Sequence, residues 1–196
     1  GYTLIQKKEG FRFGTDAVLL ANFFNGNKNS KILEIGTGNG IIPVLLCAKN
    51  KVSKIKAVEI QKEVADLALR NVKRNGLDDR IEIINMDVKD IREGNTYDYI
   101  ISNPPYMVLD GKEINNQDIK SVARHEIKLN LKEFIANARR LLKPRGELFM
   151  VHKSYRFLEI SEELIKNGFS VKRVKFVHYS KNKDSSIVLI EASKGR

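Results

Sequence analysis

The sequence predicts an α/β fold: a mostly parallel seven-stranded sheet, helices on both faces, and an antiparallel strand at the C-terminal end. Short apolar runs alternate with amphipathic stretches along the 196 residues, which is typical of parallel strands joined by helices. The last two β runs, 169–178 and 186–191, have no helical segment between them, so one must run antiparallel to its neighbour. The length suits a single domain over residues 1–196.

The elements are expected in the following order. Residues 1–29 form an N-terminal lid and helix, for which Thr15 or Asp16 can serve as the cap. A buried strand at 31–35 ends at a glycine loop, and Pro43 lies in the first turn of the helix at 40–49. Further strands are expected at 54–59, 80–85, 97–102 and 146–152. Further helices are expected at 130–142, at 155–167 and at 61–75, where the apolar stripe is Val64, Leu67, Ala68 and Val72. A substrate-side loop is expected at 107–128.

The charge balance favours a polyanionic partner. Lys and Arg number 35 against 24 acidic residues, which gives a net charge of +11. Such a surface attracts nucleic acid, although a lysine-rich surface can also serve solubility alone. The basic clusters are Lys7-Lys8-Arg12, Arg139-Arg140-Lys143-Arg145, Lys172-Arg173-Lys175 and Lys181-Lys183.

Membrane, metal and disulfide chemistry are not expected. No run of about 18 apolar residues occurs, so we expect no membrane-spanning helix. The one cysteine, Cys47, lies in an apolar helical pattern and is read as a small buried side chain, without a metal site. We therefore expect a cytoplasmic protein that is a monomer or weak dimer.

A glycine-rich turn follows the first buried strand. Gly36, Gly38 and Gly40 have the spacing Gly-x-Gly-x-Gly, which differs from the Gly-x-Gly-x-x-Gly fingerprint of dinucleotide enzymes. Glu34 precedes the first glycine, and this acid would repel a pyrophosphate but suits a ligand that carries an ammonium group. Glu59 ends the next strand, where an acid usually binds ribose hydroxyls.

The third strand is followed by Met86-Asp87, whose carboxylate can accept a hydrogen bond from an adenine amino group or can cap the next helical turn. With these features the chain resembles the class I S-adenosylmethionine-dependent methyltransferases, which implies a Rossmann-like fold and S-adenosyl-L-methionine as cofactor. The resemblance implies that the glycine loop lines the methionine and ribose, that Glu59 binds the ribose, that Asp87 binds the adenine, and that Val88 packs near the ring.

A second motif, Asn103-Pro104-Pro105-Tyr106, ends an apolar strand. The prolines remove two N–H donors, so the Asn103 side-chain oxygen and the Pro104 carbonyl can both accept from one –NH₂ group and stabilise the charge that develops on it. Tyr106 offers a ring for a planar base, whereas the plain alternative is a proline-rich turn that stops a strand. The motif resembles that of amino-methyltransferases acting on adenine, cytosine, guanine or glutamine, which implies catalytic roles for Asn103, Pro104 and Tyr106.

The segment from Gly10 to Leu20 makes the resemblance specific to one family of methyltransferases. With the closing β run it resembles the bacterial tRNA (adenine-N6)-methyltransferases that modify valine tRNA, which implies tRNA as partner and adenosine 37 as acceptor. The family usually has a short segment before the equivalent of Gly1, which fits a trimmed N-terminus here. The resemblance gives Pro105, Tyr106 and Arg124 as substrate-binding residues, with His125 read as a surface histidine. It gives as cofactor-binding residues Phe13, Gly14, Thr15, Asp16, Glu34, Gly36, Thr37, Gly38, Gly40, Glu59, Ile60, Asp87, Val88 and Asn103.

Two rival functions remain open from the sequence. A ribosomal RNA or protein glutamine methyltransferase would share Asn-Pro-Pro-Tyr, although the release-factor type normally carries a helical N-terminal domain. A non-catalytic RNA-binding module would need neither Asn103 nor the intact glycine loop.

Overall fold

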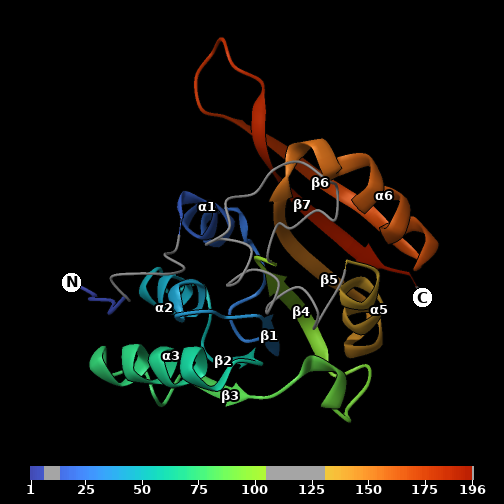
Figure 1. Ribbon diagram of the computed structural model, residues 1–196. Helices are drawn as coiled ribbons and strands as arrows, with labels where there is room; N and C mark the ends of the chain where they lie inside the picture. The colour runs from blue at the N-terminus through green and yellow to red at the C-terminus, as the bar shows by residue number, and fades with distance from the viewer. Residues whose placement is uncertain (7–13, 105–130, 196) are drawn as a thin grey trace.

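A computed structural model describes residues 1–6, 14–104 and 131–195 of the chain (Figure 1). The seven-stranded sheet has the order β3-β2-β1-β4-β5-β7-β6. Its strands are β1 (Ile32–Ile35), β2 (Ile55–Glu59), β3 (Ile81–Asn85), β4 (Tyr97–Ser102), β5 (Leu142–Lys153), β6 (Phe169–His178) and β7 (Ser185–Lys194). Its helices are α1 (Thr15–Phe23), α2 (Ile41–Ala48), α3 (Lys62–Arg74), α5 (Leu131–Leu141) and α6 (Phe157–Lys166), with short 3₁₀ turns η1 (Val88–Asp90) and η2 (Ser154–Arg156).

The topology confirms the predicted fold class. Strands β1 to β5 pair in parallel, whereas β7 pairs antiparallel with both β5 and β6. The order reverses between β1 and β4, because β2 and β3 extend to one side and β5 to the other. Ligands bind at such a switch point, outside the carboxyl ends of the strands. This edge carries both the glycine loop and the Asn-Pro turn.

Helices cover both faces of the sheet, as Figure 1 shows, with α1 to α3 on one side and α5 and α6 on the other. Successive side chains of a strand point to opposite faces of the sheet, so the core has two parts. In β4, Ile101 packs with the first group of helices and Ile100 with the second. Cys47 is buried in the first core, as expected. None of the helices in the described ranges is long and apolar enough to cross a membrane.

Several predicted boundaries are wrong by a few residues for local reasons. Leu142 belongs to β5 and not to the preceding helix, because it pairs with Tyr97 before Arg145 turns the chain at a φ of 65°. The N-cap of α1 is Gly14, so neither Thr15 nor Asp16 caps it; both lie in its first turn. The predicted helix at 155–167 divides into η2 and α6, and β7 is longer than 186–191.

The buried stripe of α3 also differs from the predicted one. Ala68 and Val72 are buried as expected, but Val64 and Leu67 are only half-buried, and Ala65 and Asn71 take their places. A count of apolar residues misses the buried Asn71, and helical spacing alone does not decide between Val64 and Ala65 as the buried position. Gly76 follows this helix with a φ of 61°, as its role at the helix end predicts.

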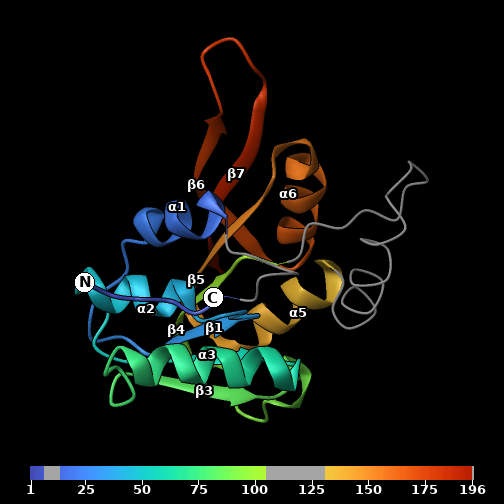
Figure 2. The same ribbon diagram turned by 60° about the vertical axis from the view of Figure 1, so that its left-hand side comes forward.

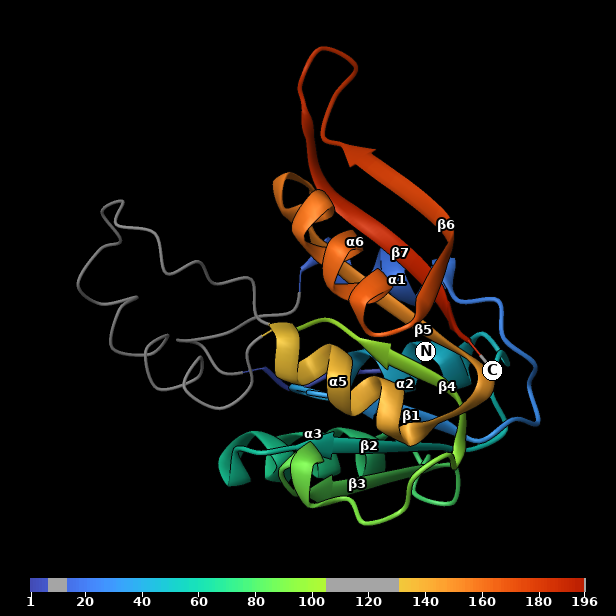
Figure 3. The same cartoon turned by 90° about the vertical axis from the view of Figure 1, so that its right-hand side faces the viewer.

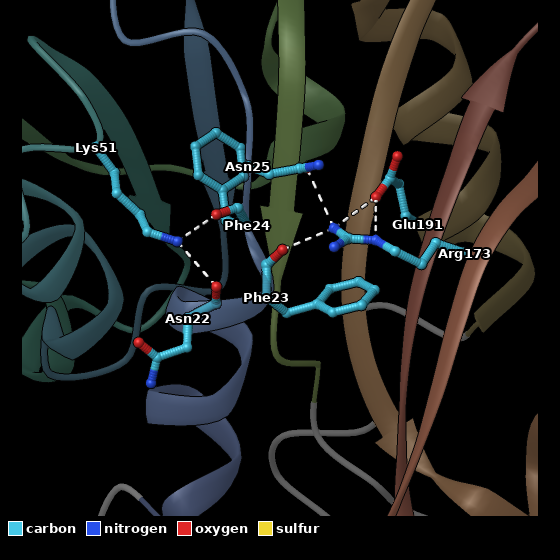
Figure 4. A network of polar contacts seen from close by, with 7 residues as sticks. All are labelled: Asn22, Phe23, Phe24, Asn25, Lys51, Arg173 and Glu191. Atoms are coloured by element: carbon cyan, nitrogen blue, oxygen red, sulfur yellow. Dashed lines mark hydrogen bonds and ion pairs between the residues drawn. The ribbon is translucent and has the colours of Figure 1, made fainter.

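The C-terminal end of α1 is tied to its neighbours by two cations (Figure 4). The guanidinium group of Arg173 on β6 lies 3.9 Å from the Phe23 ring centroid, donates to the Phe23 carbonyl at 2.7 Å, and pairs with Glu191 of β7. Lys51 donates to the carbonyls of Asn22 and Phe24. Cations are favourable at this end of a helix, where the last carbonyls lack intrahelical partners.

Candidate active site

The glycine loop between β1 and α2 forms the floor of the site. Gly36, Gly38 and Gly40 have φ values of 72°, 58° and 83°, a left-handed region that L side chains rarely adopt. A Cβ on Gly36 would meet no atom within 4 Å, so the backbone there faces open space. A Cβ on Gly40 would lie 3.4 Å from Ala68 Cβ, so this glycine allows α2 and α3 to pack closely. The first glycine therefore offers access to a ligand, and the third supports the loop.

Glu59 connects the glycine loop to the end of β2. Its Oε2 accepts from the Gly38 N–H at 3.0 Å and its Oε1 from the Gln61 N–H at 3.0 Å. The side chain of Asn85, at the end of β3, donates to the carbonyls of Glu59 and Ile60 at 2.8 and 3.1 Å. The carboxylate is thus fixed beside the loop, which is the arrangement that grips vicinal hydroxyl groups in nucleotide sites.

Glu34 is a fully buried acid next to the same loop. Its Oε2 accepts from the Thr37 hydroxyl, while its Oε1 has no hydrogen-bond partner among the described residues. The pKa of Glu34 is raised from 4.5 to about 8, chiefly by burial; the hydrogen bond from Thr37 acts against this shift and the charge of Glu59 adds to it. A buried carboxyl group with an unused oxygen is suited to a cationic ligand group, whose approach would ionise it.

The turn after β4 lies beside the glycine loop. The Ser102 hydroxyl, fully buried, donates to the Ile35 carbonyl at 2.8 Å, and this bond ties the end of β4 to the end of β1. Asn103 and Pro104 follow and are half-buried. The structure therefore places the glycine loop and the start of the Asn-Pro turn side by side at one edge of the sheet.

The other predicted site residues lie at more varied places. Asp87 caps η1, with its Oδ1 accepting from the Lys89 N–H at 3.0 Å, which is the role the sequence left open as an alternative to adenine binding. Val88 is buried in the core that α5 covers. The predicted site residues Phe13, Pro105, Tyr106 and Arg124 lie outside the described residues, as do His125 and the substrate-side loop 107–128.

The sequence reading missed Asn71, which supports the loop from below. Asn71 lies on α3 with no exposed surface, and its Nδ2 donates to the Asn39 carbonyl of the glycine loop at 2.9 Å. The same side chain exchanges two hydrogen bonds with the backbone of Ile5, at 2.7 and 3.1 Å. Asn75, one turn later, does the same with Thr3. The spacing of two asparagines by four residues, on one helix face, was the available signal.

His152 is a second residue that sequence reasoning passed over. It lies on β5 two residues beyond Met150, which pairs with Ser102, and it is buried. The pKa of His152 is lowered to about 4, chiefly by burial and then by the positive charge of Arg156. Its imidazole is therefore neutral at physiological pH, and its Nδ1 accepts from the Lys153 N–H at 2.8 Å.

Two other features of the described chain do not belong to this site. A groove at the amino ends of the strands, lined by residues such as Lys31, Lys56 and Glu82, lies at the opposite edge of the sheet. No three His, Cys, Asp or Glu side chains within residues 1–6, 14–104 and 131–195 are grouped so that they could hold a metal ion.

The strand order, the glycine loop and the two acids at the switch point define a Rossmann-like fold of the class I methyltransferase type. A solved structure described as a predicted O-methyltransferase from Agrobacterium tumefaciens has the same fold, with a TM-score of 0.71 at 20% identity over 92% of this chain and 81% of the other. The sequence profile of the methyltransferase small domain family matches residues 11–179, and the chain belongs to that family.

Two curated relatives carry a more specific name. Proteins called tRNA1(Val) (adenine(37)-N6)-methyltransferase match from Flavobacteriaceae bacterium (strain 3519-10), at 31% identity over 76% of this chain, and from Aliivibrio salmonicida, at 28% over 94%. The chain spans 63% of the length of the first relative and 78% of the second.

Proposed function

We propose that this protein transfers a methyl group from S-adenosyl-L-methionine to the N6 amino group of adenosine 37 in a tRNA. The names of the relatives support the acceptor, and the family supports the reaction class. The observation that carries the proposal is the short link from Ser102 to Ile35, which holds Asn103 next to the glycine loop. The net charge of +11 suits an RNA substrate, and we place the reaction in the cytoplasm, where tRNA is modified.

The residues present fit this cofactor. Glu34 offers its unpaired buried oxygen to the ammonium group of the methionine part, and Gly36 leaves open space for the ligand. Glu59 is fixed beside the glycine loop, where we propose that it binds the ribose hydroxyls, and we retain Asp87 and Val88 as residues of the adenine side. Gly14, Thr15 and Asp16, at the start of α1, are kept in the same proposal for the methionine end.

In this proposal Asn103 and Pro104 activate the acceptor. The cofactor supplies an electrophilic methyl group on a sulfonium ion. The Asn103 side-chain oxygen and the Pro104 carbonyl would accept hydrogen bonds from the two N–H groups of the adenine amine, which directs its lone pair toward the methyl group. They would stabilise the positive charge that forms on nitrogen as the N–C bond is made and the S–C bond breaks, with S-adenosylhomocysteine leaving as a neutral thioether. The proton then passes to water, so no buried base is required, and neutral His152 is not needed for this step.

The test offers three acceptors to the protein with labelled S-adenosyl-L-methionine: total tRNA from a strain that lacks the gene, ribosomal RNA, and a release-factor peptide with glutamine. We expect label in N6-methyladenosine of tRNA. Asn103→Ala should abolish transfer and leave the cofactor Kd nearly unchanged, whereas Asn22→Ala, on the exposed face of α1, should behave as wild type. Label on ribosomal RNA or on glutamine, with none on tRNA, would refute the proposal.

A further inference from the structure

The β6–β7 hairpin projects beyond the rest of the molecule at the edge of the sheet that carries the active site. Lys153, the last residue of β5, pairs with Ile187, so the part of β7 before Ile187 and the turn after His178 continue past the end of β5. Figures 2 and 3 show this extension from two sides, with its tip beyond α1 and α6. We call residues 175–187 the hairpin arm.

The hairpin arm exposes one aromatic ring fully at its tip and a second one in part. Tyr179, at the tip, is 87% exposed, and Phe176 is 44% exposed although its ring packs edge-on against Phe157 at 5.2 Å. Large rings on a protruding turn add nothing to a core. They are, however, the groups on which unpaired bases stack, at a typical gain of about 1–3 kcal/mol per base.

The same tip carries two exposed lysines that form no ion pair with a described carboxylate. Lys181 and Lys183 are exposed, and no carboxylate in the described ranges forms an ion pair with either of them; the Lys183 ammonium lies 5.8 Å from the Tyr179 ring centroid. In the cluster Arg139-Arg140-Lys143-Arg145, by contrast, two cations are used within the protein: Arg140 donates to the Ile91 and Val88 carbonyls, and Lys143 pairs with Asp98 at 2.6 Å.

The tip of the hairpin arm lies far from the catalytic turn, which limits the kind of partner that can contact both. Ser102 pairs with Met150 on β5, and β7 lies next to β5, so the arm rises two strands away from the catalytic turn. With about 3.3 Å per residue along a strand and about 4.8 Å between strands, the tip lies roughly 25 Å from Asn103. A partner held at both places must therefore be extended, which suits a folded RNA and not a single nucleoside.

We propose that the hairpin arm binds the RNA substrate several nucleotides away from the methylated base, with Lys181 and Lys183 on phosphates and Tyr179 stacked on an unpaired base. The identity of that RNA as a tRNA rests on the proposed function, whereas the aromatic and basic character of the arm does not. An exposed aromatic ring beside lysines is a combination by which proteins bind single-stranded or looped RNA.

The test measures binding of fluorescently labelled tRNA by anisotropy over a series of salt concentrations, separately from methyl transfer. Lys181→Gln/Lys183→Gln should weaken binding at least 10-fold and lower the salt slope by about 1.5, because two phosphate contacts are lost. Tyr179→Ala should weaken binding about 5- to 100-fold, and Tyr179→Phe should restore it. Lys28→Gln/Lys54→Gln, an equal charge change at exposed sites on the amino edge of the sheet, should leave the salt slope as in wild type.

The cofactor Kd of each arm variant should match that of wild type, which shows that the fold is intact. A tRNA affinity and salt slope equal to those of wild type in both arm variants would overturn the proposal, as would an equal loss in the Lys28/Lys54 control. If the arm variants instead lose methyl transfer only to a protein acceptor, the hairpin arm binds a protein and not RNA, and the proposal is overturned. Failure of wild type to methylate tRNA would refute the proposed function alone, because the binding measurement tests the arm with or without transfer.

Discussion

Replacing Glu34 with glutamine is expected to stabilise the ligand-free protein while weakening cofactor binding. The pKa of Glu34 is raised from 4.5 to about 8 in the folded protein, chiefly by burial, and is ordinary in the unfolded chain. The folded state therefore keeps a proton that the unfolded state loses, so the free energy of unfolding falls as pH rises from 4.5 to 8 and then levels off. At pH 7, which lies 2.5 units above the unfolded-state pKa of 4.5, the free energy of unfolding is lower than at acidic pH by at most roughly 3 kcal/mol, at about 1.4 kcal/mol per unit.

Glutamine has nearly the same shape as glutamate and cannot ionise. Glu34→Gln therefore removes the fall in the free energy of unfolding between pH 4.5 and pH 8. For a protein of this size each kcal/mol corresponds to about 2–4 °C, so Tm should rise by about 6–12 °C at pH 7 and hardly at all near pH 4.5. Circular dichroism melts at several pH values measure this, with Glu93→Gln at an exposed position as control. A variant whose Tm at pH 7 is equal to or below that of wild type would refute the reasoning. Calorimetry should show S-adenosylmethionine binding weakened about 10- to 100-fold by loss of the charged partner.

Three further substitutions test the supports of the site. Asn71→Ala should lower the free energy of unfolding by about 1–3 kcal/mol in a denaturant titration and raise the cofactor Kd, because the Ile5 and Asn39 backbone groups lose their partner; an unchanged cofactor Kd would contradict its role in placing the loop. Gly40→Ala should cost about 1–2 kcal/mol, measured in the same way, because its φ is +83°; a neutral effect would contradict that strain. Ser102→Ala should lower kcat while leaving Tm almost unchanged, because the bond from Ser102 to Ile35 aligns two strand ends. A kcat equal to that of wild type would contradict that role.

Elements set by periodicity were predictable from the sequence. The alternation of apolar runs gave seven strands and their direction, and the hairpin at 169–194 followed from the lack of a helix between its strands. The errors fall where tertiary contacts override local pattern. Leu142 continues a helical stripe by spacing, yet its pairing with Tyr97 places it in β5. Asp16 is a good cap residue, but the chain places Gly14 at the cap.

The site was predictable where chemistry and spacing coincide. Gly36, Gly38 and Gly40 stand out by their spacing, and Glu34 by its position before them. The unpaired oxygen and raised pKa of Glu34 were not predictable, because they depend on what surrounds the side chain in three dimensions. Asn71 was missed for the same reason, since its partners Ile5 and Asn39 are 66 and 32 residues away in the sequence.

The proposed reaction is methyl transfer to the exocyclic amine of one tRNA adenosine by way of Asn103. It can be tested by mass spectrometry of ribonuclease fragments after incubation of unmodified valine tRNA with the protein and S-adenosylmethionine. We expect a single added methyl group in the fragment that contains adenosine 37, identified as N6-methyladenosine after digestion to nucleosides, and no addition with Asn103→Ala. A methyl group on a ring nitrogen or ribose oxygen, or full methylation by Asn103→Ala, would contradict it.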